Sequence, residues 1–563
     1  MNVWLLRRRL LSLGATMPFD GALSKVAAAD LLPPGTSSYV SVAPSRLADT
    51  RASSGPFGFV RLNAYTIRVQ VAGRNGVPAN ATAAVLNVTV TNVTAASYVT
   101  VYPAGTSPPL ASNVNVEHAG QTIANLVTVR LSVDGAVYVY SSQANDVVVD
   151  VSGAYVPQSA PIARGRFVAL TAAFRALDTR SSGVKVGFER SIQVNLSSVL
   201  PAAAIAVVVN LTVTESIGPG YWTAHAAGSP RPNSSNLNTD LGAQTRANQA
   251  IVPVGSDGSL FGIEIFASTG GHLIVDVAGY FTGDTATPST VGLFVPSAPS
   301  RVLDTRLVPF YGRLYPDWVV EFDFVGRSVA QAVATNLTTT QTRGAGYFTG
   351  YPARNKRPLA SNLNASYPNQ TIANHAILRN SSVGVAVYTQ SGGHVIVDVA
   401  GYFTGSPVSA PLPAPVNIPP PSQLPYLLQI PKIGIVAAVV EGIGSDVVDN
   451  GLVGHWPGTG LAGQGGHTLL FAHRTKSTAL FRNIHLLGPG DEITLSAFDG
   501  RVYHYQYARR DITNTDSQLI YNVGLYAALP NVSLVACSKT NFLPTSLDYR
   551  LVVTFSLTST DPG

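Results

Sequence analysis

The sequence predicts an all-β protein, with three tandem antiparallel β-sandwich or barrel-like repeats followed by a β-barrel of different sequence. Three observations lead to this prediction. The chain is rich in glycine and proline, with 51 and 38 residues, and in Val, Thr, Ser and Asn, which favour short strands and turns. Stretches such as Asn87–Thr91 alternate polar and apolar side chains with the period of a strand. One ordered set of motifs also recurs three times before the sequence changes character near residue 405.

The overall composition limits the classes of function open to the chain. Its 563 residues suffice for about three to five domains. Only 12% of residues are charged and the net charge is +6, which argues against a coiled coil, a charge-driven disordered chain and an extended nucleic-acid-binding surface. The single cysteine, Cys537, excludes an intramolecular disulfide and a cysteine-based metal site. We therefore expect no cofactor, no metal and no nucleic-acid partner.

The three repeats span residues 36–156, 162–283 and 290–404, and each has the size of a domain. Each contains a DTR tripeptide, an alternating strand that begins at Asn87, Asn210 or Asn336, an SNxN element, a QTxAN element and an apolar closing strand. The DTR aspartates are Asp49, Asp178 and Asp304. These units resemble a repeat domain common in secreted actinobacterial proteins, and the resemblance implies a β-rich surface domain without a settled activity.

The DTR tripeptides place a carboxylate beside an arginine and could be taken for a catalytic site. The simpler interpretation is a turn held by an Asp–Arg pair, with asparagine side chains bonded to the backbone of the loops. The histidines favour this interpretation, because no histidine position is shared by all three repeats. We therefore expect the repeats to be structural or binding units, with a possible association with the cell wall.

The chain begins with a candidate signal segment, residues 1–30, which combines a basic cluster at Arg7–Arg9, a short apolar stretch and small residues at Ala27–Ala29. No apolar run reaches the ~18–20 residues that would span a bilayer. These features predict a secreted protein or one held at the cell surface or cell wall. Residues 405–423 form a proline-rich linker, which we expect to act as a semi-rigid spacer before the C-terminal domain at 424–559.

The C-terminal domain carries the residues with chemical potential. Its short alternating segments predict a closed β-barrel. Cys537 ends one apolar strand and Arg550 begins the next, so antiparallel pairing of the two strands would place both residues at one rim of the barrel. His473 ends another apolar run and can reach the same rim.

A thiol, an imidazole and a guanidinium together suit attack on an amide carbonyl. The thiolate is the nucleophile, and a nearby cation favours it. A fixed cation or donor stabilises the tetrahedral oxyanion, and a histidine can protonate the leaving amine. The product would be a thioacyl-enzyme, which water or another amine resolves.

The same residues belong to a series of motifs that resembles the sortase family. In order, these motifs are Ile430–Ile435, Gly454–Thr459, His473-Arg474, Phe481, Leu487–Ile493, Tyr503–Tyr505, Leu534–Cys537 and Arg550–Val553. The resemblance implies a β-barrel cysteine transpeptidase, with Cys537 as the nucleophile, His473 as the catalytic histidine and Arg550 as the arginine that orients the substrate and stabilises the oxyanion. Three positions depart from the family pattern: Ala536 replaces a threonine, Ala472 a glycine and His467 an asparagine.

The sequence thus predicts an enzyme that cleaves a sorting-signal peptide through a thioacyl-enzyme. The acyl group would pass to an amine on a peptidoglycan precursor or another protein at the cell surface. Two alternatives stay open: a cysteine peptidase that acts by hydrolysis, and a non-catalytic cell-wall-associated or adhesive repeat protein with a relic barrel, for which Ala536 is the best support. Of the other histidines, we expect His455 to shape a loop, and His467, His485 and His504 to be surface or packing residues.

Overall fold

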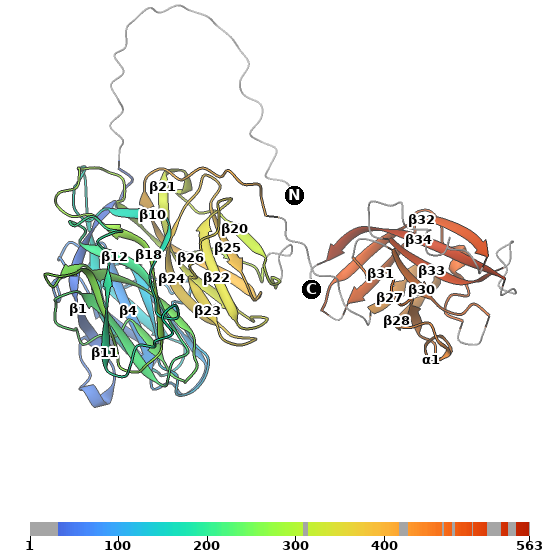
Figure 1. Cartoon of the computed structure of the whole chain (residues 1–563), viewed down its shortest axis with the longest axis horizontal. Coiled ribbons are helices and arrows are strands. Elements are labelled where there is room, and N and C mark those ends of the chain that lie inside the picture. Colours follow the sequence, from blue (N-terminus) through green and yellow to red (C-terminus); the bar gives the residue numbers. More distant parts are fainter. Residues whose placement is uncertain are drawn as a thin grey trace, which may run out of the picture.

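The computed structural model describes residues 32–307, 313–415, 426–463, 467–475, 479–497, 499–514, 531–538 and 548–561. Strands make up nearly all the regular structure of these residues, and the α-helix among them, α1, spans only Ser445–Val448. Figure 1 shows the repeats in blue to yellow and the C-terminal barrel in orange to red. The prediction of an all-β fold is confirmed. The candidate signal segment lies outside the described residues.

Short 3-10 turns complete the regular structure of the described residues. They are η1 (Ala52–Ser54), η2 (Arg327–Val329), η3 (Pro431–Ile433) and η4 (Ile484–Leu486). Among the described residues, no helix has the length and apolar character that crossing a membrane would require.

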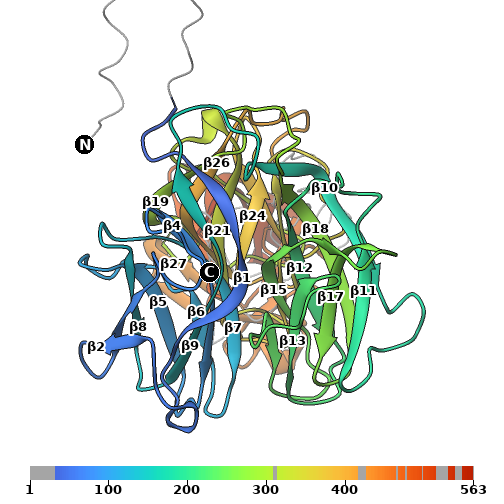
Figure 2. The same ribbon diagram turned by 90° about the vertical axis from the view of Figure 1, so that its left-hand side faces the viewer.

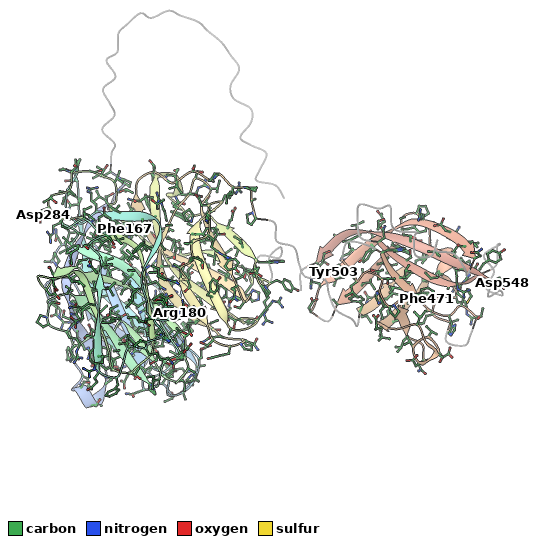
Figure 3. The ribbon with its side chains drawn as sticks, in the orientation of Figure 1. Phe167, Arg180, Asp284, Phe471, Tyr503 and Asp548 are labelled. Carbon is green, nitrogen blue, oxygen red and sulfur yellow. The ribbon has the colours of Figure 1, made fainter. Side chains whose placement is uncertain are left out.

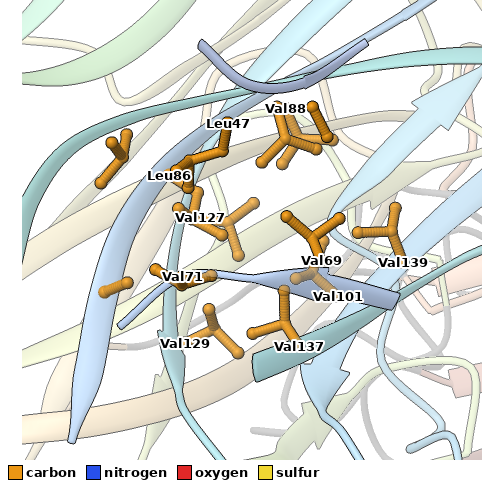
Figure 4. Packing of buried hydrophobic residues seen from close by; sticks show 14 of the residues in the cluster. Leu47, Val69, Val71, Leu86, Val88, Val101, Val127, Val129, Val137 and Val139 are labelled. Carbon is orange, nitrogen blue, oxygen red and sulfur yellow. The ribbon is translucent and has the colours of Figure 1, made fainter. Parts of the chain in front are cut away.

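Each repeat is a sandwich of inner and outer antiparallel strands, and the inner strands of repeats 1 and 3 join into one eight-stranded sheet at the pairing of Ser37 with Phe294. In repeat 1 the inner strands are β1 (Ser37–Asp49), β4 (Ala83–Thr91), β7 (Ile123–Arg130) and β9 (Asp146–Pro157), and the outer strands are β2 (Phe59–Arg61), β3 (Thr66–Gln70), β5 (Ser97–Pro103), β6 (Val114–Val116) and β8 (Ala136–Ser141). Valine and leucine side chains from both sheets fill the space between them (Figure 4). The alternation seen in the sequence thus directs one side of each strand into this core.

Repeats 2 and 3 follow the same plan. The inner strands of repeat 2 are β10 (Phe167–Asp178), β12 (Ala206–Thr214), β15 (Arg246–Pro253) and β18 (His272–Phe281), and the outer ones are β11 (Arg190–Asn195), β13 (Gly220–Ala226), β14 (Leu237–Thr239), β16 (Gly255–Ser256) and β17 (Phe261–Ala267). In repeat 3 the inner strands are β19 (Phe294–Asp304), β21 (Ala330–Thr340), β24 (Ile372–Arg379) and β26 (His394–Thr404), and the outer ones are β20 (Val319–Phe322), β22 (Gly346–Pro352), β23 (Leu363–Ala365) and β25 (Val385–Thr389).

The three repeats share a second core where their inner sheets meet. Figure 2 shows β7, β15 and β24, one strand from each repeat, gathered near the middle of the block, and these strands contact one another. The shared core takes equivalent residues from each repeat, including the tilted ring contact of Tyr155 with Phe294, with centroids 4.3 Å apart. Its members are Tyr39, Ala83, Val85, Leu126, Tyr155, Phe167, Ala206, Val208, Ile251, Phe281, Phe294, Ala332, Ala334, Ile377 and Phe403. The repeats therefore form one closed body with approximate threefold symmetry.

Buried asparagines of two sequence motifs link the repeats in a ring. The asparagine of each QTxAN element donates its side-chain amide to the first asparagine of the alternating strand in another repeat. The pairs are Asn125 to Asn336 at 2.9 Å, Asn248 to Asn87 at 3.3 Å and Asn374 to Asn210 at 3.0 Å. Because a buried amide must find partners, these bonds explain why both motifs occur in every repeat.

The DTR tripeptides form the predicted Asp–Arg turns. Asp49 pairs with Arg51 at 2.6 Å, and the equivalent pairs in repeats 2 and 3 measure 2.7 and 2.6 Å. Arg46, three residues before Asp49, also pairs with Asp150 of the closing strand and donates to the main-chain carbonyl of Asn233 in repeat 2. Arg175 and Arg301 repeat this arrangement with the carbonyls of Leu359 and Leu110. The landmarks of the repeats thus build the fold and the contacts between repeats.

The C-terminal domain is a closed barrel of eight strands, as predicted. Around the barrel the order is β27 (Tyr426–Ile430), β28 (Ile435–Glu441), β29 (Val453–His455), β30 (His467–Phe471), β33 (Asn531–Ser538), β34 (Tyr549–Asp561), β32 (Val502–Asn514) and β31 (Glu492–Ala497). The pairs β28–β29 and β30–β33 are parallel, and the other pairs are antiparallel. Of three neighbouring strands, β33 contains Cys537, β34 contains Arg550 and β30 ends two residues before His473.

Candidate active site

The strand register brings the candidate residues to one end of the barrel. Cys537 on β33 is paired with Arg550 on β34. On the other side of β33, Phe471 of β30 is paired with Val535 in parallel, and His473 and Cys537 each lie two residues beyond that pair. In Figure 3 this end is marked by Asp548, which precedes β34, and Tyr503 marks the opposite end. Strand pairing therefore places Cys537 beside Arg550, and His473 follows two residues after the last β30 residue that pairs with β33.

Side-chain alternation separates this site from the barrel core. Leu534, Ala536 and Leu551 belong to the core cluster, whereas Val535 and Val552 form a separate cluster on the other face of their strands. Cys537 alternates with Ala536 and is partly exposed, so its thiol is on the outer face and not deep in the core. A nucleophile needs this access to meet a substrate.

The imidazole of His473 contacts a carboxylate that the sequence analysis did not single out. Its Nε2 lies 2.6 Å from Oδ1 of Asp449, the residue that follows α1. Both side chains are partly exposed. A carboxylate at this distance fixes the orientation of an imidazole ring. Asp449 gave no signal in the sequence, because it lies in a connection far from the strands that hold Cys537 and Arg550.

Arg474, the residue after His473, is buried against the strand that carries the nucleophile. It is 1% exposed, and its Nη1 donates to the main-chain carbonyl of Cys537 at 2.9 Å. Its Nη2 lies 3.2 Å from Nδ1 of His485. Burial lowers the pKa of Arg474, and the negative form of Cys537 acts in the opposite direction. Arg474 thus joins the end of β33 to the segment after β30. In the sequence, its position next to His473 was the one indication that Arg474 belongs to the site.

A buried polar chain crosses the same three strands at their other end. Nε2 of His467 lies 2.6 Å from Oγ of Ser533, which lies 2.7 Å from Oγ1 of Thr554. Burial lowers the pKa of His467 to about 4, so this ring is neutral at pH 7. His467 is thus a packing residue with a hydrogen-bond partner, within the expectation from the sequence.

The other residues noted in the sequence occupy structural positions. Nε2 of His455 contacts the carbonyl of Gly460 at 3.0 Å and the hydroxyl of Thr459 at 3.1 Å, so His455 shapes a turn as expected. His485 is partly exposed, beside Arg474, and His504 is a partly exposed partner of Asp561. Among the described residues, no group of three or more His, Cys, Asp and Glu could hold a metal ion.

The comparisons with known proteins match the C-terminal barrel. Residues 428–558 match the family described as the sortase domain. Sortase SrtE1 of Streptomyces coelicolor is 39% identical over 85 residues, which cover 14% of this chain and 24% of that protein. The match therefore spans about a quarter of the length of this curated relative.

Solved sortase structures were also found. SrtA sortase from Actinomyces oris is 22% identical, with 26% of this chain and 88% of that chain covered and a TM-score of 0.24. Sortase E1 from Streptomyces coelicolor, solved with a tripeptide in its active site, is 27% identical, with 24% and 89% covered and a TM-score of 0.22. The family match confirms the resemblance seen in the sequence motifs. The C-terminal barrel of this protein is accordingly a sortase domain, over residues 428–558.

Proposed function

We propose that the barrel is a cysteine transpeptidase that cleaves a sorting-signal peptide and transfers the acyl part to an amine. The single observation that carries the proposal is the strand register, which pairs Cys537 with Arg550 at the end of β33 beside the strand that His473 follows. The match of residues 428–558 to the sortase domain supports this chemistry. Cys537 is the nucleophile, His473 moves the proton, and Arg550 stabilises the oxyanion and orients the substrate.

In the first half of the reaction, the Cys537 thiolate attacks the carbonyl carbon of the scissile amide. The carbonyl π electrons move to oxygen, and the positive charge of Arg550 stabilises the resulting oxyanion, an effect typically worth about 10²–10³ in rate. When the tetrahedral intermediate collapses, the C–N bond breaks and protonated His473 gives its proton to the leaving amine. The product is a thioester between Cys537 and the N-terminal part of the substrate.

In the second half, an amine attacks the thioester carbonyl and now-neutral His473 accepts the proton that the amine loses. The C–S bond breaks, the Cys537 thiolate leaves and a new amide forms. Asp449 holds the His473 ring through both halves, and Arg474 holds the carbonyl of the nucleophile's own residue. If water attacks in place of the amine, the same site is a hydrolytic peptidase.

The proposed partners follow from this chemistry. The first substrate is a protein with a sorting motif of the Leu/Pro/Ala-x-Thr-Gly kind, and the acceptor is an amine on a peptidoglycan precursor or another protein. Both would be met at the cell surface. The tripeptide in the active site of the Streptomyces coelicolor enzyme supports a peptide substrate for the barrel fold.

The test uses the full chain with peptides of the Leu-Pro-x-Thr-Gly and Leu-Ala-x-Thr-Gly types, with and without triglycine as the acceptor. We expect a covalent adduct whose mass equals the peptide fragment before the cleaved bond, and hydroxylamine should release it. Because Cys537 is the single cysteine of the chain, the adduct has one possible sulfur. Cys537→Ala should abolish both adduct and product.

The products distinguish the alternatives. A ligated peptide that forms only with triglycine supports transpeptidation, whereas free acid at the same rate with and without triglycine supports a hydrolytic peptidase. Two results together would contradict the enzyme proposal and favour the relic barrel. These are the absence of any adduct and a rate of iodoacetamide alkylation at Cys537 that the peptides do not change.

A further inference from the structure

A pocket lies between repeats 1 and 2, far in the sequence from the sortase domain. Its volume is about 480 Å³, within the range of ~300–1,000 Å³ typical of sites for small ligands. Repeat 1 contributes Arg46 and Arg51 of the DTR region, and repeat 2 contributes Tyr221, Arg231 and Asn233. The pocket thus exists only because two repeats meet, at the contact between Arg46 and the carbonyl of Asn233.

The charged side chains that line this pocket are positive, whereas the carboxylates that pair with two of them are buried behind the lining. Three arginines line it, and no aspartate or glutamate does. The carboxylates that pair with Arg46 and Arg51 belong to Asp49 and Asp150, whose side chains are 0% and 3% exposed. A ligand in the pocket therefore meets guanidinium groups and not the carboxylates that balance two of them.

Arg231 provides the positive charge that is not balanced. Its guanidinium carbon lies 3.7 Å above the centre of the Phe266 ring, within the range of a cation–π contact. Within the part of the chain that the structure describes, Arg231 forms no ion pair with a carboxylate. A stacked guanidinium keeps its edge available for two parallel hydrogen bonds to a carboxylate or a phosphate.

The rest of the wall suits a ligand with many hydroxyl groups. Hydroxyl and amide side chains dominate it, and Thr91 and Thr122 already hold each other in place at 2.9 Å. Tyr221 is 40% exposed and offers a ring face of the kind on which a sugar ring can lie. Apart from Val148 and Pro232, the wall offers little to an apolar ligand.

The equivalent positions in the other repeats lack this combination. Where repeat 2 has Arg231, Asn233 and Ser234, repeat 1 has Pro108, Leu110 and Ala111. Repeat 3 keeps the arginine as Arg357, whose guanidinium carbon lies 3.4 Å above the Tyr388 ring centre, but it has Leu359 and Ala360 in place of the asparagine and serine. The polar side chains that complete the pocket are therefore particular to the contact between repeats 1 and 2.

We propose that this pocket binds an anionic, hydroxyl-rich unit, a sugar or polyol that carries a carboxylate or a phosphate. Arg231 pairs with the anionic group, Tyr221 packs against the carbon skeleton, and the hydroxyl and amide side chains bond to the hydroxyl groups. The site belongs to the repeat block and does not depend on the activity proposed for the barrel, so either proposal can fail without the other.

The test is isothermal titration of the full chain with three probes: trigalacturonic acid for a carboxylate sugar, a glycerol phosphate oligomer for a phosphate polyol, and cellotriose as a neutral saccharide. We expect one of the two anionic probes to bind with a stoichiometry of one, and the binding to weaken as NaCl rises from 0.05 to 0.5 M, because salt screens the charge on an open pocket. Equal binding of cellotriose would overturn the anionic recognition, and no binding of any probe would overturn the site.

Two variants locate the binding. Arg231→Ala should weaken the anionic probe about tenfold, as expected for the loss of a charge-assisted contact. The double change Asn233→Leu with Ser234→Ala installs the residues that repeats 1 and 3 carry at these positions, so the fold accepts them, and it should also weaken binding. Arg357→Ala, the stacked arginine of repeat 3, is the matched control and should leave binding unchanged. If Arg357→Ala weakens binding as much as Arg231→Ala does, the pocket is not the site.

Discussion

The carboxylate of Asp449 lies 2.6 Å from the imidazole of His473, although the two residues come from different connections of the barrel. In the antiparallel register on the neighbouring strands, Cys537 faces Arg550. The carboxylate of Asp449 thus orients the ring of His473, whereas backbone pairing of two strands places Cys537 opposite Arg550.

The contact with Asp449 should matter for the rate and little for folding. We expect Asp449→Ala to slow formation of the thioester on Cys537 by about tenfold or more, because a freely rotating imidazole is less often placed to protonate the leaving amine. Burst-phase mass spectrometry of the acyl-enzyme measures this step. Asp446→Ala, on the adjacent helix α1, should leave the rate unchanged. A rate loss of equal size in both variants would indicate a general disturbance of this segment.

Arg474 should control both the stability of the barrel and the reactivity of the thiol. Replacing it with methionine leaves the carbonyl of Cys537 without its donor, at a cost of about 1–3 kcal/mol in the free energy of unfolding. The same change removes a positive charge close to the sulfur, so the rate of alkylation by iodoacetamide at pH 7 should fall. Arg474→Lys should retain more of the alkylation rate than of the stability, and Arg509→Met on the barrel surface should affect neither. An unchanged alkylation rate in Arg474→Met would show that this charge does not act on the thiol.

The buried His467 should make the barrel sensitive to acid. Its pKa is about 4 in the folded protein and near 6.5 when unfolded, so the unfolded state binds the proton more readily. The stability that neutral His467 contributes is therefore complete above about pH 6.5 and is lost as the pH falls towards 4. Urea unfolding of the barrel, followed between pH 7 and pH 4, should show this decline. His467→Asn should make the decline shallower, and an equally steep decline in that variant would assign it to other groups.

The ring of asparagines should make the three repeats unfold together. Removing one amide, as in Asn248→Ala, takes the hydrogen bond of Asn248 away from the side-chain oxygen of Asn87 in another repeat, and we expect a cost of about 1–3 kcal/mol. Because the repeats share a core, the loss should lower the stability of the whole block in one transition, as measured by calorimetry. Asn63→Ala, in an exposed turn, is the control. Separate melting of repeat 2 alone would contradict a single cooperative block.

The sequence could predict the β class and the alignment of Cys537 with Arg550, because both depend on local alternation and on the pairing of two strands that follow one another. The Asp49–Arg51 turn was predictable for the same reason, since its partners are two residues apart. These features are local in the chain, and local geometry limits the possible outcomes.

The closed arrangement of the repeats and the contact of Asp449 with His473 were not predictable in the same way. Asn125 and Asn336 are 211 residues apart, and nothing in either motif states which distant amide it meets. Asp449 has no periodic pattern around it and no motif attached to it. Such partners are chosen by tertiary packing, which the sequence of one chain does not display.

The shared core of Tyr155, Phe294 and their neighbours also constrains how this architecture can evolve. In a string of independent modules, copies can be gained or lost to change the length of a stalk. Here each module closes against the other two, so deletion of one would expose two large apolar surfaces and insertion of a fourth would have no place in the ring. The number three is consequently a property of the assembly.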